Sequence, residues 1–117
     1  MPGCSVEREV VGGIAWYRVS GKFEGACAWH LTSKLQSEPL GAVMIDFSQV
    51  NDFSDYGIAV VATALLDART KSVRLRGLRQ HQERVFQCFG VDARGLQSGP
   101  LAALAPDELP ALADKVA

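Results

Sequence analysis

The feature that most constrains the fold is a pair of apolar runs in the middle of the chain, separated by a polar segment. The first run, residues 42–45, is short and rich in β-branched side chains, which is typical of a buried strand. The second begins at Ile58 and continues to about Thr70, a length that predicts a helix. The segment between them, residues 46–57, therefore leads from the carboxyl end of a strand to a helix N-terminus. Because α/β proteins commonly place their binding or active sites at such ends, we expect the functional site of this chain here.

The chain before this segment predicts a hairpin and a helix. Residues 6–11 and 14–20 are strand-like and flank Gly12-Gly13, which suits a two-residue turn because glycine readily adopts positive φ. A helix follows from the segment 21–25 to about Ser37. Its inward face is predicted from three- and four-residue spacing. The residues of that face are Ala28, Leu31 and Leu35.

The chain after this segment continues to alternate between strand and helix patterns. Residues 73–78 alternate in polarity and predict a strand, and residues 80–89 predict a helix packed through Val85, Phe86 and Phe89. We expect residues 92–100 to form a loop. A short edge strand over residues 101–104 and a last helix opened by Pro106 complete the prediction.

The order of these elements predicts an α/β fold with a mixed sheet of four to five strands. The sheet should have a parallel core, because a strand–helix–strand unit spans residues 42–78. An N-terminal β-hairpin and about four helices complete it, and residues 1–117 are expected to form a single domain.

Composition excludes several classes of function. The formal charge of −1, from 12 basic and 13 acidic residues, argues against a nucleic-acid partner. The sequence has neither the pattern of a signal peptide nor an apolar run of transmembrane length, so we expect a cytoplasmic protein without membrane insertion. Its three cysteines lack CxxC spacing and predict reduced thiols, with Cys27 and Cys88 as small core residues. His30 and His81 lack ligand spacing, and we predict no metal site, no cofactor and no catalytic residues.

The order of elements and several local motifs resemble the STAS domain family, the fold of bacterial anti-sigma factor antagonists. The turn at residues 21–24 (Gly-Lys-Phe-Glu) matches a Gly-x-Leu-Asp-like turn of the family, and residues 46–48 (Asp-Phe-Ser) match an Asp-Leu-Ser-like step. Residues 50–58 fall on the signature segment Val-x-x-hydrophobic-Asp-Ser-Ser-Gly-Leu. Gly77 and the step at residues 89–91 match later positions.

The chain departs from the family at the position that the resemblance implies is the switch. In anti-sigma factor antagonists the second serine of Asp-Ser-Ser-Gly is phosphorylated. Alignment on Gly57 and Ile58 places Ser54 at the aspartate, Asp55 at the first serine and Tyr56 at the phospho-acceptor. A serine kinase would not modify Tyr56, so we expect binding that is not phospho-switched at this position.

The resemblance and the local pattern together suggest a partner-binding loop. Its predicted residues are Glu24, Asp52, Ser54, Asp55, Tyr56 and Gly57. Ser54 or Asp55 is a candidate cap for the following helix. Asp55 either complements the helix dipole or imitates part of a phosphorylated state. Tyr56 is either an exposed interface anchor or packs locally on Phe53. Glu24 is either a site carboxylate or the acid at a helix start.

These observations predict a non-enzymatic regulatory binding module. By resemblance, it would dock a kinase-type anti-sigma factor or a similar protein through residues 52–58, as a monomer or weak homodimer. Two alternatives stay open, since some STAS domains sense nucleotides or other ligands, and others are cytoplasmic subunits of lipid ABC transport systems. We expect no enzymatic activity.

Overall fold

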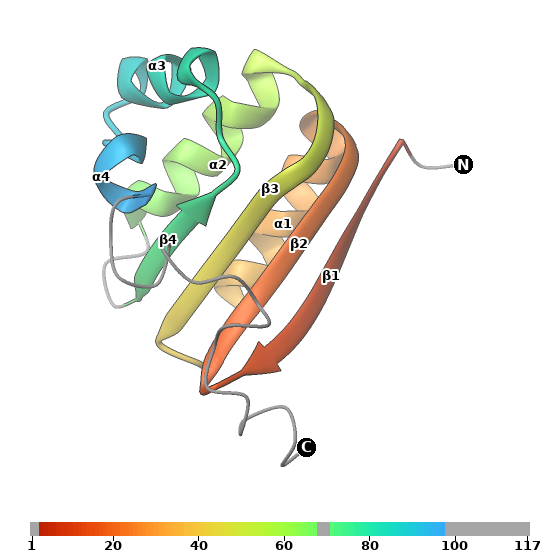
Figure 1. Ribbon diagram of the computed structural model, residues 1–117, viewed down its shortest axis with the longest axis vertical. Helices are drawn as coiled ribbons and strands as arrows, with labels where there is room; N and C mark the ends of the chain where they lie inside the picture. The colour runs from red at the N-terminus through yellow and green to blue at the C-terminus, as the bar shows by residue number, and fades with distance from the viewer. Residues whose placement is uncertain (1–2, 68–70, 98–117) are drawn as a thin grey trace.

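The computed structural model describes residues 3–67 and 71–97, and their strands form one mixed sheet beside four helices (Figure 1). The strands lie in the order β1-β2-β3-β4; β1 is antiparallel to β2, and the other pairs are parallel. This confirms the predicted α/β class. The elements are β1 (Cys4–Val11), β2 (Ile14–Phe23), α1 (Gly25–Gln36), β3 (Ala42–Phe53), α2 (Asp55–Asp67), β4 (Ser72–Arg76), α3 (Gln80–Cys88) and α4 (Ala93–Gln97).

The N-terminal hairpin forms as the two glycines predict. Gly12 and Gly13 have φ values of 62° and 79°, which an L side chain rarely adopts. They let Val11 pair directly with Ile14, so that the hairpin closes through the shortest common turn. The edge strand β1 is thereby fixed in register against β2.

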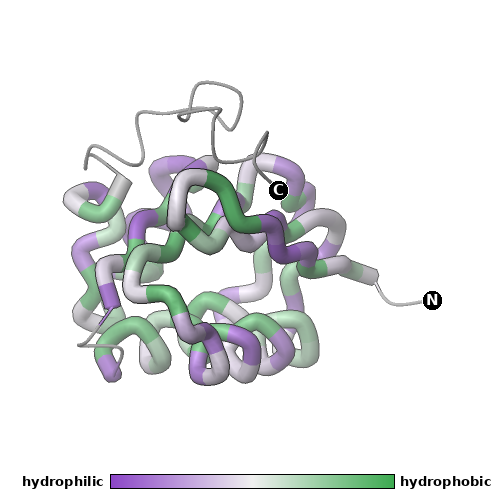
Figure 2. Tube along the Cα trace, turned by 90° about the horizontal axis from the view of Figure 1, so that it is seen from below, coloured by the Kyte–Doolittle hydropathy of each residue, from purple (hydrophilic) through white to green (hydrophobic). Residues whose placement is uncertain are grey.

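The main core lies between the sheet and its helices, with α1 and α2 behind the sheet in Figure 1. The predicted inward face of α1 is confirmed, because Ala28, Leu31 and Leu35 are all buried. Strand residues alternate between two clusters, since Tyr17 joins the helix-side core whereas Trp16 packs with Met44. Figure 2 shows hydrophobic and hydrophilic segments alternating along the helices, as an amphipathic face requires.

Strand β3 is longer than predicted, and this corrects the expectation of a loop after Asp46. The strand continues to Phe53 because its second half pairs with the end of β2, through two irregularities in register. The ring of Phe23 lies 5.3 Å from that of Phe47 and 5.9 Å from that of Phe53, so an aromatic cluster anchors the extension. The exposed residues of this second half are polar, so the sequence pattern resembles that of a loop.

The region after β4 also differs from the prediction. Residues 93–97 form the short helix α4 rather than a loop, because Asp92 Oδ1 accepts a hydrogen bond of 3.0 Å from the Gly95 amide. Phe86 is buried as expected, but Phe89 is 42% exposed and does not serve as a core residue. The predicted strand at residues 101–104 and the helix from Pro106 lie outside the described residues.

The prediction of reduced thiols is wrong for two of the three cysteines. Cys4, at the start of β1, forms a disulfide with Cys27 in the first turn of α1, with the Cα atoms 6.3 Å apart. The fold brings together two positions 23 residues apart, which sequence spacing did not indicate. Cys27 is buried as predicted, whereas Cys88 is an exposed free thiol and not a core residue.

Candidate partner-docking site

The predicted site residues meet because β2 and β3 are parallel and end at the same edge of the sheet. Lys22 pairs with Asp52, and Phe23 pairs with Phe53. One residue further on, the Ser54 amide donates a hydrogen bond of 2.9 Å to the Phe23 carbonyl oxygen. Helices α1 and α2 therefore both begin at the upper end of the sheet in Figure 1, beside one another.

Ser54 is the cap of α2. Its Oγ accepts a hydrogen bond of 3.1 Å from the Gly57 amide, while its carbonyl oxygen accepts the first helical bond from Ile58. A hydroxyl in this role satisfies one of the free N–H groups of the first turn. The hydroxyl closest to Tyr56 in the sequence is therefore occupied in holding the helix start.

Asp55 lies in the first turn of α2, where a negative charge complements the helix dipole. Its Oδ1 is 3.9 Å from His81 Nε2, and both side chains are about 70% exposed. Such an exposed pair contributes little to stability. Asp55 is consequently an accessible charge on the surface beside Tyr56.

Gly57 is required by the close approach of α2 to the end of β2. A Cβ at this position would lie 3.1 Å from the Phe23 carbonyl oxygen and 3.3 Å from the Glu24 carbonyl oxygen. Because both neighbours are backbone atoms, they have little freedom to withdraw. The glycine thus brings the two helix starts together and forms part of the site only through its backbone.

Tyr56 is 60% exposed and lies across the first turn of α1. A Cβ on Gly25 would come within 2.6 Å of Tyr56 Cε2, so the ring rests directly over this glycine. The Tyr56 hydroxyl accepts a long hydrogen bond of 3.4 Å from Trp29 Nε1, and Trp29 is itself 57% exposed. The ring of Phe53 packs instead with those of Phe23 and Phe47. This geometry favours an exposed anchor over local packing on Phe53.

A shallow groove runs between α1 and α2 from this aromatic pair. It has a volume of about 320 Å³ and is bordered along its length by small and polar side chains. Its lining residues are Trp29, Thr32, Gln36, Tyr56, Ala59, Val60, Thr63, Ala64 and Asp67. Sequence reasoning missed Trp29 as a site residue, although a large aromatic off the buried face of a predicted helix was a usable signal. Tryptophan and tyrosine are, with arginine, the residues most enriched at the hot spots of protein interfaces.

The remaining predicted carboxylates lie at the margin of this surface. Glu24 occupies the N-cap position of α1 but makes no capping bond, and its Oε1 is 3.7 Å from Lys22 Nζ. Asp52 is exposed on β3, opposite Lys22 in the register. The two carboxylates therefore present accessible negative charge beside one lysine. Such charges suit the polar rim of a protein interface.

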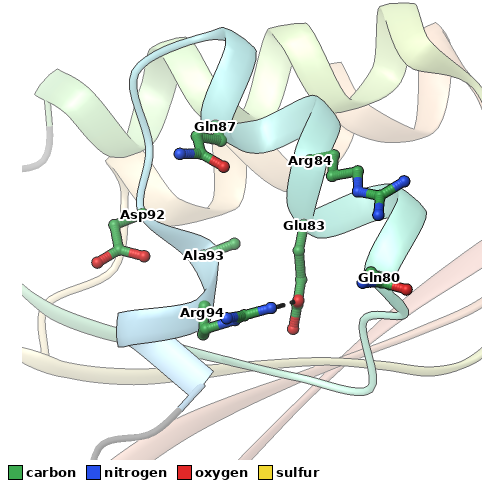
Figure 3. A pocket seen from close by; sticks show the side chains of 7 residues that line it. All are labelled: Gln80, Glu83, Arg84, Gln87, Asp92, Ala93 and Arg94. Carbon is green, nitrogen blue, oxygen red and sulfur yellow. Dashed lines mark ion pairs between the residues drawn. The ribbon is translucent and has the colours of Figure 1, made fainter.

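Another cavity lies between α3 and α4 (Figure 3). Arg94 Nε is 3.8 Å from Glu83 Oε1 across it, and Asp92 and Gln87 face the same space. Its lining contains none of the predicted docking residues.

Among the described residues, no group of three or more His, Cys, Asp or Glu side chains is arranged to hold a metal ion. The helices of the described part are all too short or too polar to cross a membrane.

The fold and this edge of the sheet define an α/β domain with its candidate site at two adjacent helix starts. The chain belongs to the STAS domain family, because residues 17–101 match the family model described as "Mlab, STAS domain". No curated protein matches the chain.

Solved structures show the same fold at low sequence identity. The anti-sigma factor antagonist SpoIIAA in its unphosphorylated form is 16% identical, with a TM-score of 0.59 over 75% of this chain and 83% of that one. A Moorella thermoacetica RsbS variant is 15% identical, with a TM-score of 0.57 over 77% of this chain and 81% of that one. These similarities confirm the resemblance to anti-sigma factor antagonists in fold.

Proposed function

We propose that this chain is a non-enzymatic regulatory module that docks a protein partner through the starts of α1 and α2. The observation that carries the proposal is the exposed pair of Trp29 and Tyr56, which lines one end of the groove, with the Tyr56 ring over Gly25. Large aromatic side chains that are exposed yet fixed in position lose little conformational entropy on binding. Glu24, Asp52 and Asp55 supply a charged rim around them.

The preferred partner is a kinase-type anti-sigma factor or a similar protein. This assignment is supported by the fold shared with SpoIIAA and RsbS, of which the first is named an anti-sigma factor antagonist. In the proposed alignment Tyr56 replaces the phospho-acceptor serine, so serine phosphorylation at this position does not control docking. In this assignment the domain is also a monomer or weak homodimer in the cytoplasm.

A second candidate is a cytoplasmic STAS subunit of a lipid ABC transport system. Two observations favour it: Tyr56 offers no acceptor to a serine kinase, and the matching family model carries the name Mlab rather than that of an antagonist. Here the same aromatic pair would dock onto a membrane ATPase. The two candidates share the surface and differ in the partner.

The test is affinity capture from lysate of the native host, with bound proteins identified by mass spectrometry. Wild-type protein is compared with Tyr56→Glu, which places a charge in the aromatic pair. Phe89→Glu is the matched control, because it puts the same charge on an exposed aromatic outside the groove. We expect a kinase-like anti-sigma protein to be lost with Tyr56→Glu and retained with Phe89→Glu.

Other results of the capture experiment, and a separate thermal-shift measurement, would change the assignment. Specific capture of an ABC ATPase would select the second candidate. A thermal shift that saturates with GTP or ATP would indicate a nucleotide sensor instead. If all three baits capture the same proteins, the Tyr56 surface is not the interface and the site assignment is wrong.

A further inference from the structure

The disulfide between Cys4 and Cys27 lies beside the proposed docking surface. Cys27 is in the first turn of α1, three residues after Glu24 and two before Trp29. Cys4 is the first residue of β1, and it pairs with Gly21 of β2, three residues before Glu24. The covalent bond therefore joins the edge strand to the helix that carries half of the proposed surface.

The disulfide borders a cavity that can admit an attacking thiol. The cavity has a volume of about 470 Å³ and is lined by both cysteines. Cys27 is only 5% exposed, whereas Cys4 is half-buried, so Cys4 is the more accessible cysteine of the pair. Lys22 and His30 also line the cavity, together with Glu24, which lies near Lys22. The lysine ammonium favours approach of an anionic thiolate.

Apart from the disulfide, the start of β1 is held mainly by its pairing with β2. Residues 4–10 are half-buried or exposed, and β1 is an edge strand of the described sheet. The Lys22 amide donates a hydrogen bond of 2.6 Å to the Gly3 carbonyl oxygen, and the hydroxyls of Ser5 and Ser20 are 2.8 Å apart on the surface. Because most of these side chains are accessible, we expect the segment to open locally at a lower free energy than the core once the covalent bond is broken.

We propose that Cys4–Cys27 is a thiol–disulfide exchange site for a dithiol reductant of the thioredoxin class. A thiolate of the reductant attacks the sulfur of Cys4, forming a mixed disulfide, and the sulfur of Cys27 leaves as a thiolate that takes up a proton. The second thiol of the reductant then attacks the reductant's first sulfur, which is bonded to Cys4 in the mixed disulfide. Cys4 leaves as a thiolate and takes up a proton. The protein gains two electrons and two protons, and the reductant becomes a disulfide.

Reduction would free the start of β1 from α1. Gly21 has no room for a Cβ, because the Gly3 carbonyl oxygen would lie 2.3 Å and the Cys4 Cα 3.2 Å away, so the chain at Gly3 and Cys4 lies directly against the end of β2. Its release would expose the end of β2 and the cavity that both cysteines line. The effect on partner docking rests on the proposed function, whereas exchange and release do not.

The test uses the full chain carrying Cys88→Ser, which removes the exposed third thiol. Oxidised protein is incubated with excess reduced thioredoxin in native buffer and then alkylated, so that intact mass and peptide mapping count the free thiols. A thioredoxin without its resolving cysteine is used to trap the mixed disulfide. Hydrogen exchange is followed in the same samples, with Cys4→Ser/Cys27→Ser/Cys88→Ser as the permanently open reference.

We expect Cys4 and Cys27 to become alkylated together while the protein stays folded, and the trap to be recovered on Cys4. Amide exchange should rise at least tenfold over residues 4–6 and 19–22, matching the open reference, and stay unchanged in the first half of β3. Resistance of the bond to thioredoxin unless denaturant is present would overturn the proposal. So would reduction that leaves exchange unaltered, or failure of the bond to form in oxidised glutathione. These readouts need no partner, so they are independent of the docking proposal.

Discussion

The carboxylate of Glu38 accepts two hydrogen bonds from the guanidinium of Arg8, at 2.6 and 2.9 Å, across 30 residues of sequence. The same carboxylate accepts from the Tyr17 hydroxyl and the Leu40 amide, and its side chain is fully buried. This network joins β1 and β2 to the connection between α1 and β3, at the opposite end of α1 from the proposed docking surface. The Glu38 side chain is buried, whereas that of Arg8 is partly exposed. Removing one partner of a bidentate pair with a buried member is costly, because polar groups that were paired lose their charged partner.

Glu38→Gln should lower the free energy of unfolding by about 2 kcal/mol, because it leaves the Arg8 guanidinium and the Tyr17 hydroxyl with a weaker, neutral acceptor. Urea denaturation measures the change. Glu9→Gln is the control, since Glu9 makes an exposed pair with Arg18 at 2.9 Å and should change stability by less than about 0.5 kcal/mol. Equal effects of the two substitutions would show that the buried network does not contribute as described.

The stability of the wild type should fall as the pH is lowered from about 5 to about 2. Hydrogen bonds from Arg8 lower the pKa of Glu38 to about 2, against an ordinary value of 4.5. A lowered carboxyl pKa means that the folded state releases its proton more readily, so this contribution is complete above pH 5 and is lost on acidification. Urea titrations at several pH values should show a shallower acid slope for Glu38→Gln. Parallel slopes would contradict this assignment.

At alkaline pH, burial and the Glu38 hydrogen bond raise the pKa of Tyr17 to about 12 from its ordinary value of 10. The contribution of the protonated hydroxyl is therefore complete below pH 10 and is lost as the pH rises through 12. Tyr17→Phe should be less stable than the wild type at pH 8, and the difference should shrink by pH 12. Ultraviolet titration of tyrosinate in the folded protein checks the pKa directly, and Tyr56→Phe assigns the second tyrosine. A normal titration of both tyrosines would refute this prediction.

Gly57→Ala should destabilise the protein by about 1–2 kcal/mol, although alanine ordinarily favours a helix over glycine. The added methyl group would meet the Phe23 and Glu24 carbonyl oxygens at 3.1 and 3.3 Å. Gly41→Ala is the matched control, because a Cβ there has nothing within 4 Å. Thermal and urea unfolding of both variants measure the change in the free energy of unfolding. A neutral or stabilising Gly57→Ala would mean that the helix starts are less closely packed than described.

The two tryptophans should differ sharply in fluorescence. Trp16 is fully buried, whereas Trp29 is 57% exposed. Acrylamide should quench a red-shifted component that disappears in Trp29→Phe, leaving a blue-shifted spectrum with little quenching. Trp29 emission then reports directly on occupation of the groove between α1 and α2. Strong quenching that persists in Trp29→Phe would contradict the burial of Trp16.

The parts of the fold that local pattern specifies were predictable. The Gly12-Gly13 turn needs positive φ, and the spacing of Ala28, Leu31 and Leu35 matches one helical face, so both are read without knowledge of distant contacts. The Ser54 cap was predictable for the same reason, as a short hydroxyl at a helix start. Each of these depends on interactions within a few residues.

The features that depend on neighbours distant in sequence were not predictable. The second half of β3 contains Asn51 and Asp52, and only its pairing with β2 makes it a strand. The Cys4–Cys27 bond requires that the edge strand start beside α1, which no spacing rule supplies. The site shows the same division, because Tyr56 was identified from the motif, whereas its contact with Trp29 follows from helix packing.

The placement of the Tyr56 ring over Gly25 has a consequence for how the sequence can vary over evolutionary time. Any residue other than glycine at position 25 would project a Cβ into the ring, so the two positions cannot change independently while the aromatic stays in place. In related chains, a large aromatic at the position of Tyr56 should accompany glycine at the position of Gly25. Where position 25 carries a side chain, position 56 should hold either a small residue or an aromatic ring that is turned away from position 25. The two positions should therefore covary in an alignment of related chains.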